Sequence, residues 1–292
     1  MNEANNFIAK TVPLNSKTML DSARVSINPT PSKMNNLTYV DAHLHLADKG
    51  YSGQIQEIVS DADRNSISRL LSNATDYQTS VETLETARKY HPTVLAAIGV
   101  HPWTANIETD YQLDKFEELI KANDNLVEAI GEIGLDGKYP QTEGTRKRQQ
   151  KVFEFFLQTA ERHELPVIVH SRQALEDVLT TLPKYNPPKV LLHWYDGPTE
   201  NLRLIKDAGY FISVGPPILY SQRMSTIAGE ADLNSILTET DGPVTYSGPF
   251  KGRMTKPSFV IDVARKLAQI KSLSLETVQE AIIANFRELL GE

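Results

Sequence analysis

From residue 38 onward, short runs of apolar and β-branched residues alternate with longer stretches in which apolar residues recur every three or four positions. Short runs of this kind are typical of buried strands, and a spacing of three to four is typical of amphipathic helices. Regular alternation of the two patterns predicts βα units around a parallel sheet. We therefore expect an α/β fold.

Eight of the short runs are predicted to be strands. They cover 38–44, 67–74, 93–101, 126–135, 165–170, 189–194, 209–215 and 236–241. The predicted helices include 54–66, 80–91, 111–122, 145–163, 172–182, 199–209, 258–270 and 274–291. Eight strands with interleaved helices over about 250 residues favour a (β/α)8 TIM barrel with C-terminal helices, although a doubly wound open sheet would give similar local patterns.

Residues 1–36 have a different composition. They contain seven asparagines, little sustained periodicity and the turn-prone run NPTPSKMNN. We expect a flexible or disordered tail over 1–36 and a single domain over 37–292. Met34 stands just before the first predicted strand, and a start there would leave the domain intact. A transit peptide is a weaker alternative, because the tail contains one arginine, Arg24.

The whole chain has 292 residues, of which 40% are hydrophobic and 23% charged, an ordinary globular composition. A net charge of −7 argues against broad electrostatic binding to nucleic acid or to an anionic membrane. No run approaches the roughly 20 apolar residues that span a bilayer, and the N-terminus lacks the apolar core of a secretory signal. We expect a cytoplasmic protein with no membrane partner and no obligate protein partner.

The chain contains no cysteine, so any metal ion must be held by histidines and carboxylates. Functional side chains of a TIM barrel gather at the C-terminal ends of the strands. The candidates at or near predicted strand ends are His43, His45, His101, Glu132, His170, His193 and Asp241. Apart from His101, they form a set of nitrogen and oxygen donors suited to one or two divalent ions. His91 and His163 lie elsewhere and are expected at the surface.

The stretch DAHLHL at 41–46 shows why these histidines attract attention. In a strand, residues two apart point to the same face, so His43 and His45 would project side by side. Two alternating histidines would also be ordinary on an exposed strand. The other strand-end donors favour the metal site over that alternative.

Taken in order, eight stretches resemble the motifs of the TatD-type metal-dependent hydrolases in the amidohydrolase superfamily. They are DAHLHL, GVHPW, GEIGLD, RQQKVFEFFLQTAERHELPVIVHSR, LLHWYDG, GYFISVG, TETDGP and NFRELLG. The resemblance covers 39–290. It implies a TIM barrel with two divalent ions (Mg²⁺, Mn²⁺ or Zn²⁺) that cleaves phosphodiester bonds, typically as a deoxyribonuclease and often from a 3′ end.

The resemblance also implies a ligand set. His43, His45 and Asp241 would hold one ion, His170 and His193 the other, and Glu132 would bridge both. His101 would lie near the reaction centre but outside the metal shell. Asp241 could also orient or deprotonate the attacking water, because its second oxygen stays free. The alternatives are that Asp241 caps a turn and that His101 is structural.

Substrate contacts are predicted from charge and from aromatic rings. The guanidinium of Arg172 matches phosphate geometry, and Lys251, Arg253 and Lys256 form a second candidate group after the last strand. Trp194 and Tyr195 could stack on a nucleobase or pack against the barrel rim, and Trp103 has the same two alternatives. The expected substrate is a DNA end or a short nucleic acid.

Two other functions are weighed against this one. The same site could hydrolyse an amide, a lactone or another small substrate, since the stretch after Asp241 lacks the Asn-Glu-Pro element common in bacterial members. A binding protein that has lost catalysis is disfavoured, because all six ligand positions are filled.

Overall fold

The structure is a computed structural model that describes residues 38–139 and 142–292. The predicted tail over 1–36 lies outside the described residues, and the domain boundary at 37 stays a prediction. In the described part of the chain, strands and helices alternate as the pattern predicts, with two helices in succession at the end.

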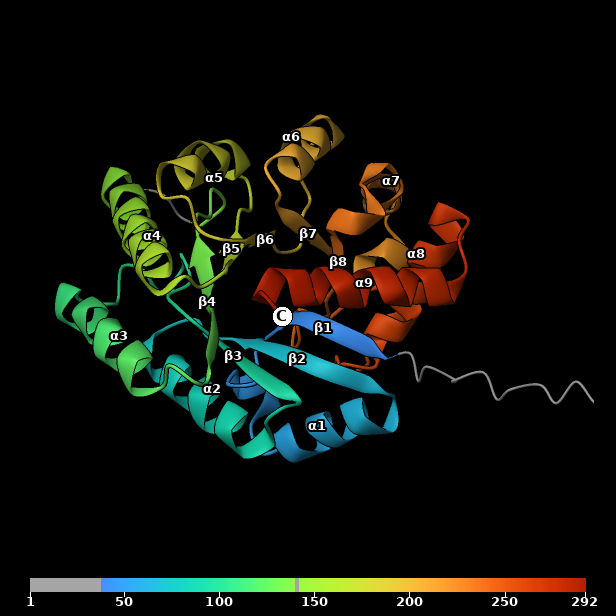
Figure 1. Cartoon of the computed structure of the whole chain (residues 1–292), viewed down its shortest axis with the longest axis horizontal. Coiled ribbons are helices and arrows are strands. Elements are labelled where there is room, and N and C mark those ends of the chain that lie inside the picture. The colour runs from blue at the N-terminus through green and yellow to red at the C-terminus, as the bar shows by residue number, and fades with distance from the viewer. Residues whose placement is uncertain (1–37, 140–141) are drawn as a thin grey trace, which may run out of the picture. The chain divides into compact units, whose positions relative to one another are not determined.

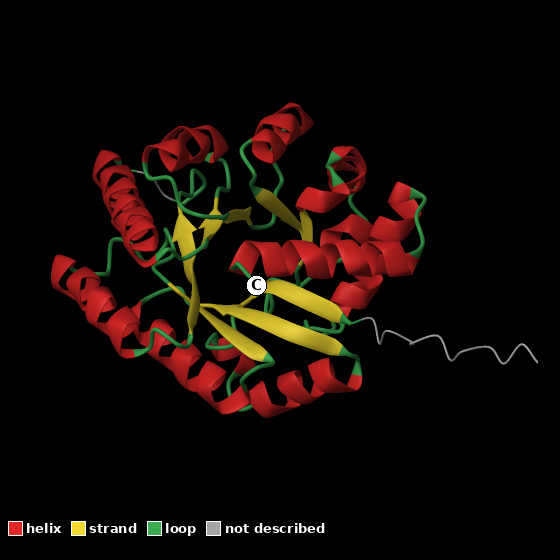
Figure 2. Ribbon diagram, in the orientation of Figure 1, coloured by secondary structure: helices red, strands yellow, loops and turns green. Residues whose placement is uncertain are grey.

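Eight parallel strands form the centre of the domain (Figure 2). They are β1 (Tyr39–Leu44), β2 (Ile67–Asn73), β3 (Val94–Ile98), β4 (Val127–Gly134), β5 (Val167–His170), β6 (Val190–Leu192), β7 (Phe211–Val214) and β8 (Ile236–Thr238). Each pairs with the next along the chain in parallel register. This order confirms the (β/α)8 barrel and excludes the doubly wound sheet, whose strand order reverses.

Helices surround the strands (Figure 1). They are α1 (Ile55–Arg64), α2 (Tyr77–Tyr90), α3 (Asp110–Ala122), α4 (Glu143–His163), α5 (Leu175–Thr181), α6 (Leu202–Asp207), α7 (Gln222–Glu230), α8 (Phe259–Lys271) and α9 (Leu275–Leu290). Side chains of Asp76, Thr109 and Thr142 cap α2, α3 and α4 by accepting a backbone N–H of the first turn. These caps fix where the helices begin.

Hydrogen bonds close the ring between β1 and the end of β8. The backbone N–H of Asp241 donates to the carbonyl of His43 at 2.8 Å, and that of His45 donates to the carbonyl of Gly242 at 2.7 Å. The buried carboxylate of Asp41 accepts the backbone N–H of Thr240 at 2.9 Å. The closure therefore brings His43, His45 and Asp241 to one place.

Helix α9 lies beside β1, where Figure 1 marks the C-terminus. The amide of Asn285 donates to the carbonyls of Leu233 and Ile236, at 2.8 and 2.7 Å. Phe286 and Leu289 on the same helix are buried in the core. The predicted C-terminal helices are confirmed, and they hold the strands that close the barrel.

Most elements begin or end within three residues of the predicted bounds, and two differences are described further. Strands β3 and β8 end at Ile98 and Thr238, three residues before their predicted ends, because the chain turns there into the loops that carry His101 and Asp241. The sequence pattern does not predict helix α7, since its nine residues bury an apolar face of only Met224, Ile227 and Ala228. Among the described residues, no helix is long and apolar enough to cross a membrane.

Candidate metal centre

Seven side chains predicted from the sequence meet at the carboxyl ends of the strands. His43 lies in β1 with His45 two residues later, Glu132 lies in β4, and His170 ends β5. The other three follow β3, β6 and β8, and are His101, His193 and Asp241. Six of the seven are buried, and His45 is half-buried. The strands thus place all seven in one largely buried cluster.

The two remaining histidines lie away from this cluster, as expected. His91 is exposed at the end of α2. His163 in α4 is half-buried, and its Nε2 lies 2.9 Å from Oε2 of Glu117 on α3.

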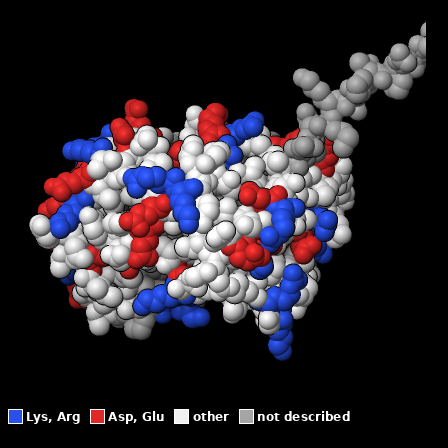
Figure 3. Space-filling view, turned by 90° about the horizontal axis from the view of Figure 1, so that it is seen from below, with Lys and Arg blue, Asp and Glu red and all other residues white. Residues whose placement is uncertain are grey.

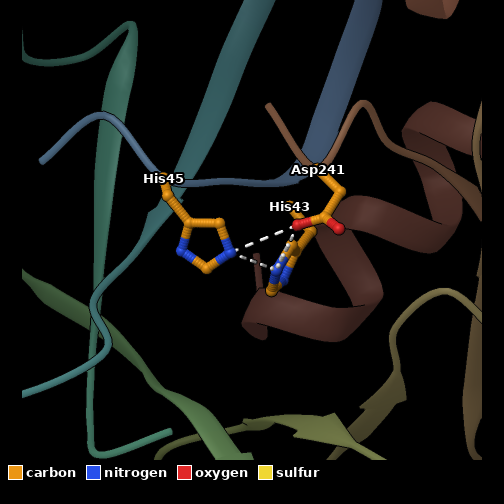
Figure 4. Close-up of side chains that lie close together, drawn as sticks. All are labelled: His43, His45 and Asp241. Carbon is orange, nitrogen blue, oxygen red and sulfur yellow. Dashed lines mark hydrogen bonds and ion pairs between the residues drawn. The ribbon is translucent and has the colours of Figure 1, made fainter. Parts of the chain in front are cut away.

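His43, His45 and Asp241 form the first group of donors (Figure 4). The Nε2 atoms of the two imidazoles are 3.1 Å apart. Oδ1 of Asp241 lies 3.4 Å from Nε2 of His43 and 3.2 Å from Nε2 of His45. Two imidazole nitrogens and one carboxylate oxygen that face a common point suit a divalent cation.

His170 and His193 form the second group. Nδ1 of His170 and Nε2 of His193 are 3.3 Å apart. They lie 2.8 and 2.7 Å from the same oxygen, Oε1 of Glu132.

Glu132 stands between the two groups. Its other oxygen, Oε2, lies 3.4 Å from Nε2 of His43 and 3.3 Å from Nε2 of His45. One carboxylate therefore turns one oxygen to each group of histidines. A carboxylate can serve two ions in this way, whereas each neutral imidazole offers one lone pair.

Hydrogen bonds behind the histidines select which ring nitrogen faces the cluster. Nδ1 of His45 lies 2.9 Å from the carbonyl oxygen of Asn73, which can only accept, so Nδ1 donates and Nε2 keeps its lone pair when the ring is neutral. Nε2 of His170 lies 2.8 Å from Oδ2 of Asp136 and donates to it in the same way, which leaves Nδ1 facing Glu132. Such partners fix the tautomer of metal-binding histidines.

Sequence reasoning missed two buried carboxylates behind the histidines. Asp136 supports His170, and Oε2 of Glu239 lies 3.8 Å from Nδ1 of His193 while it accepts a hydrogen bond from Ser213. The sequence signals were faint. Asp136 ends the GEIGLD stretch, two residues past β4, and Glu239 precedes Asp241 by two residues.

His101 differs from the other histidines. Its Nδ1 accepts the backbone N–H of Trp103 at 3.1 Å, so in the neutral ring the proton is on Nε2. Burial lowers the pKa of His101 to about 4, although Glu132 acts in the opposite direction. Nε2 lies 3.4 Å from Oε1 of Glu132. His101 therefore presents a neutral N–H donor to the cluster.

The charges of the other groups depend on one another. Burial disfavours the Glu132 carboxylate, but His193, His101 and His43 hold its pKa well below the usual value. Burial also disfavours a charged His45, but Asp241 and Glu132 outweigh it and raise its pKa to about 9. The carboxylates of Glu132 and Asp241 are thus ionised, and their negative charge stabilises positive charge at the centre of the cluster.

Comparison with known proteins identifies the family. The family model described as TatD related DNase matches residues 40–291. The chain belongs to this family. The predicted resemblance is confirmed, and the protein is a metal-dependent hydrolase of the TatD family.

Similar proteins agree with this assignment. An uncharacterized metal-dependent hydrolase of Methanocaldococcus jannaschii is 31% identical over 252 residues, 86% of this chain and 96% of the relative. The human deoxyribonuclease TATDN3 is 31% identical over 260 residues, 86% of this chain and 93% of the relative. The crystal structure of YjjV, a TatD homologue of Escherichia coli, superimposes with a TM-score of 0.81 at 25% identity and covers 87% of this chain and 98% of that one.

In this TatD-family chain five of the six donors line a cavity of about 590 Å³, the site cavity; they are His45, Glu132, His170, His193 and Asp241, while His43 lies buried behind them. Arg172 also lines this cavity, beside the donors, and its binding of phosphate stays a prediction. Its Nε and Nη2 lie 3.0 and 2.7 Å from Oδ2 of Asp136, and its guanidinium stands 5.0 Å from the centre of the Trp103 ring. These contacts hold one positive charge in a fixed place.

The second group of predicted phosphate contacts lies elsewhere. Lys251 and Arg253 are exposed, and the Arg253 guanidinium stands 4.7 Å from the centre of the Phe259 ring. Nζ of Lys256 lies 3.5 Å from Oε1 of Glu57. None of the three is among the described residues that line the site cavity. Their binding of phosphate stays a prediction.

The three aromatic candidates have different surroundings. Trp103 is 44% exposed, and its Nε1 donates to Asp136 at 2.8 Å. Trp194 is half-buried and lines the site cavity. Tyr195 is fully buried, and its hydroxyl donates to the carbonyl of Pro198 at 2.6 Å, so it packs and cannot stack on a base.

The distribution of surface charge bears on how strongly the protein attracts a polyanion. Figure 3 shows basic and acidic side chains interspersed over the face in view, without a broad basic area there. This agrees with the net charge of −7. Attraction of a polyanion on that face would be weak, so charge near the donors matters more.

Proposed function

We propose that this TatD-family hydrolase is a two-metal phosphodiesterase that acts on DNA in the manner of a 3′-exonuclease. The observation that carries the proposal is the position of Glu132, whose two oxygens turn to two separate groups of donors. His43, His45 and Asp241 would hold one ion, and His170 and His193 the other. Glu132 would bridge them.

The residues present fit such ions. The donors are imidazole nitrogens and carboxylate oxygens, which suit Zn²⁺ or Mn²⁺ and, through the carboxylates, Mg²⁺. The tautomers of His45 and His170 leave lone pairs on the inner nitrogens. When bound, divalent ions lower the pKa of a water and stabilise negative charge on phosphoryl oxygens.

The chain's own groups would then bind, orient and move protons. Arg172, held by Asp136, would bind a phosphoryl oxygen of the substrate. Asp241 faces the histidines with Oδ1, so its Oδ2 would orient the attacking water and accept its proton. His101 would donate a hydrogen bond from its Nε2–H to an oxygen of the reacting phosphate, since its Nδ1 accepts the N–H of Trp103.

DNA is proposed as the substrate because the human relative is named a deoxyribonuclease and the family model a TatD related DNase. The exposed ring of Trp103 lies under Arg172 at the same cavity, where a base could stack beside a bound phosphate. Both features suit an unpaired strand end.

The test is cleavage of end-labelled single-stranded DNA by metal-stripped protein that is resupplied with Mg²⁺, Mn²⁺ or Zn²⁺. We expect metal-dependent shortening from the 3′ end. Glu132→Ala should lose at least about 100-fold in rate, because it removes a ligand of both ions. Glu128→Ala, on the same strand but outside the site cavity, is the matched control and should keep the activity. DNA left intact under all three ions would refute the proposal.

A second candidate is hydrolysis of a small amide, lactone or ester at the same donors. It is favoured by one observation: among the described residues that line the site cavity, Arg172 is the one arginine or lysine. A single cation can bind the one anionic group of a small substrate. Turnover of a lactone or an amide, with no cleavage of DNA by the same preparation, would select this candidate.

A further inference from the structure

A second cavity of about 740 Å³ lies next to the site cavity. The two share Ser171, Trp194 and Asp196 in their linings. The second cavity is otherwise lined from the loops after β5, β6 and β7 and from the first turns of α5 and α7. The two cavities therefore adjoin at these three residues.

Trp194 is a fixed wall between the two cavities. Its backbone has a φ of +40°, and its N–H donates to the hydroxyl of Ser213 at 2.9 Å. Its ring lies 5.7 Å from that of Tyr246, centre to centre, with a tilt of 33°. A bulky residue adopts positive φ only where its surroundings impose it, and such residues are concentrated at binding sites.

Tyr220 supplies a second aromatic surface in this cavity. The residue is 42% exposed although it is a large ring. It packs against Gly248, where a Cβ would come within 2.7 Å of the Tyr220 ring. Two aromatic rings that are held from behind and open to a cavity are suited to a flat ligand.

The polar groups of the second cavity differ from those around Arg172. Its lining carries the carboxylates of Glu176, Asp177 and Asp196. The one guanidinium in the lining, that of Arg223, donates to the backbone carbonyl of Asp196. Excess negative charge opposes a phosphate, whereas carboxylate oxygens accept hydrogen bonds from N–H groups.

We propose that the second cavity binds the nucleoside next to the scissile phosphate, with its base against Trp194 and Tyr220. The inference rests on the proposed function and adds the part of the substrate that is recognised. Adenine, cytosine and guanine carry exocyclic amino groups whose two N–H bonds can donate to the carboxylates, whereas thymine has no amino group and offers a single N–H, at N3. The cavity therefore favours the three amino-bearing bases over thymine.

Fluorescence can locate the ligand because the chain has two tryptophans, Trp103 and Trp194. Trp103 lines the site cavity alone, and Trp194 lines both. In the full-length Trp103→Phe protein the emission comes from Trp194, and in Trp194→Phe it comes from Trp103. Each protein is titrated with deoxyadenosine, thymidine and inorganic phosphate in Mg²⁺ buffer. Nucleosides contain no phosphodiester and are not consumed.

We expect deoxyadenosine to quench Trp194 at a lower concentration than it quenches Trp103, where a base can also stack. Thymidine should bind at least about threefold more weakly, and phosphate should not quench Trp194. Tyr220→Ala, made in the Trp103→Phe background, should weaken deoxyadenosine binding by about fivefold or more, because it removes a stacking surface. Tyr111→Ala is the matched control, since Tyr111 is 68% exposed on α3 and lines neither cavity.

Three results would overturn the proposal: quenching of Trp103 instead of Trp194, quenching of Trp194 by phosphate equal to that by deoxyadenosine, or equal loss in Tyr220→Ala and Tyr111→Ala. A polyamine that quenches Trp194 or displaces deoxyadenosine at the same concentrations at which deoxyadenosine binds would also overturn it, because the cavity would then select cations. Nucleoside binding is measured without catalysis. Failure of DNA cleavage with intact nucleoside binding, or the reverse, therefore separates this inference from the proposed function.

Discussion

One oxygen of Asp136 accepts hydrogen bonds from His170, Trp103 and Arg172. It therefore joins a proposed metal ligand to the proposed phosphate contact. Asp136→Asn should weaken ion binding by about 10- to 100-fold, because loss of such a partner disturbs both the tautomer and the basicity of the histidine. Calorimetric titration with Mn²⁺ measures this effect. Asp110→Asn, which removes an exposed carboxylate paired with Lys151 and Arg148, should leave the affinity unchanged.

The raised pKa of His45 predicts how the affinity for a metal ion depends on pH. Burial alone would lower it, but Asp241 and Glu132 raise it to about 9, so the metal-free protein keeps a proton on His45 at pH 7. A cation must displace that proton. The apparent affinity for Mn²⁺ should therefore rise between pH 6 and pH 9, with proton uptake by the buffer at pH 7. An affinity that stays flat over this range would contradict the assignment of His45 as a ligand.

The predicted cluster residues could be found from the sequence because they are metal-donor side chains that stand at or near the ends of predicted strands. Histidine is rare in this chain, and His170 ends an apolar run. Its position at a predicted strand end can therefore be recognised without a structure. Asp136 and Glu239 could not be assigned in the same way. Aspartate and glutamate are common, and their burial depends on strands that meet only in the folded barrel.

At the scale of elements, Gly134 determines how closely β4 approaches β5. Its φ is +135°, and a Cβ there would lie 2.1 Å from the carbonyl oxygen of His170. Gly134→Ala should lower the free energy of unfolding by at least about 3 kcal/mol, because backbone strain and overpacking add. Gly53→Ala is the matched control. It has a φ of +73° with open space around it, so it should cost only about 1 kcal/mol.

Urea unfolding of both variants, followed by circular dichroism, gives this comparison. Equal losses in Gly134→Ala and Gly53→Ala would mean that the approach of the two strands is not what requires glycine. The position of Gly134 within GEIGLD shows the limit of sequence reasoning at this scale. The pattern predicted the strand, but it could not show that Gly134 lies against the backbone of His170 on the neighbouring strand β5.

Strand ends were the least predictable part of the elements. The β-branched residues Val100 and Thr240 follow the ends of β3 and β8, so the strand pattern extends to His101 and Asp241. Hydrogen bonding ends both strands earlier, because these residues must turn into the cluster. The order of strands was predictable only to two alternatives, the barrel and the doubly wound sheet, since right-handed βα units in sequence leave few other arrangements.

At the scale of the whole molecule, the donors come from five strands or their following loops, namely β1, β4, β5, β6 and β8. Ions bound there stabilise only the complete barrel. With Mn²⁺ at about 100 times its dissociation constant, each site should add about 2.7 kcal/mol to the free energy of unfolding. The melting temperature should rise by roughly 5 °C or more, and chelation should reverse it. Glu132→Ala should show little of this shift, and an equal shift in that variant would place the ions elsewhere.

Closure of the ring between β1 and β8 also has a consequence for synthesis of the chain. His43 and His45 leave the ribosome early, whereas Asp241 is added only when most of the barrel has been made. Until then the first group of donors lacks its carboxylate partner from the far side of the ring. A nascent or prematurely terminated polypeptide that stops before residue 241 cannot assemble that group, so hydrolytic capacity arises only after nearly the whole domain has been translated.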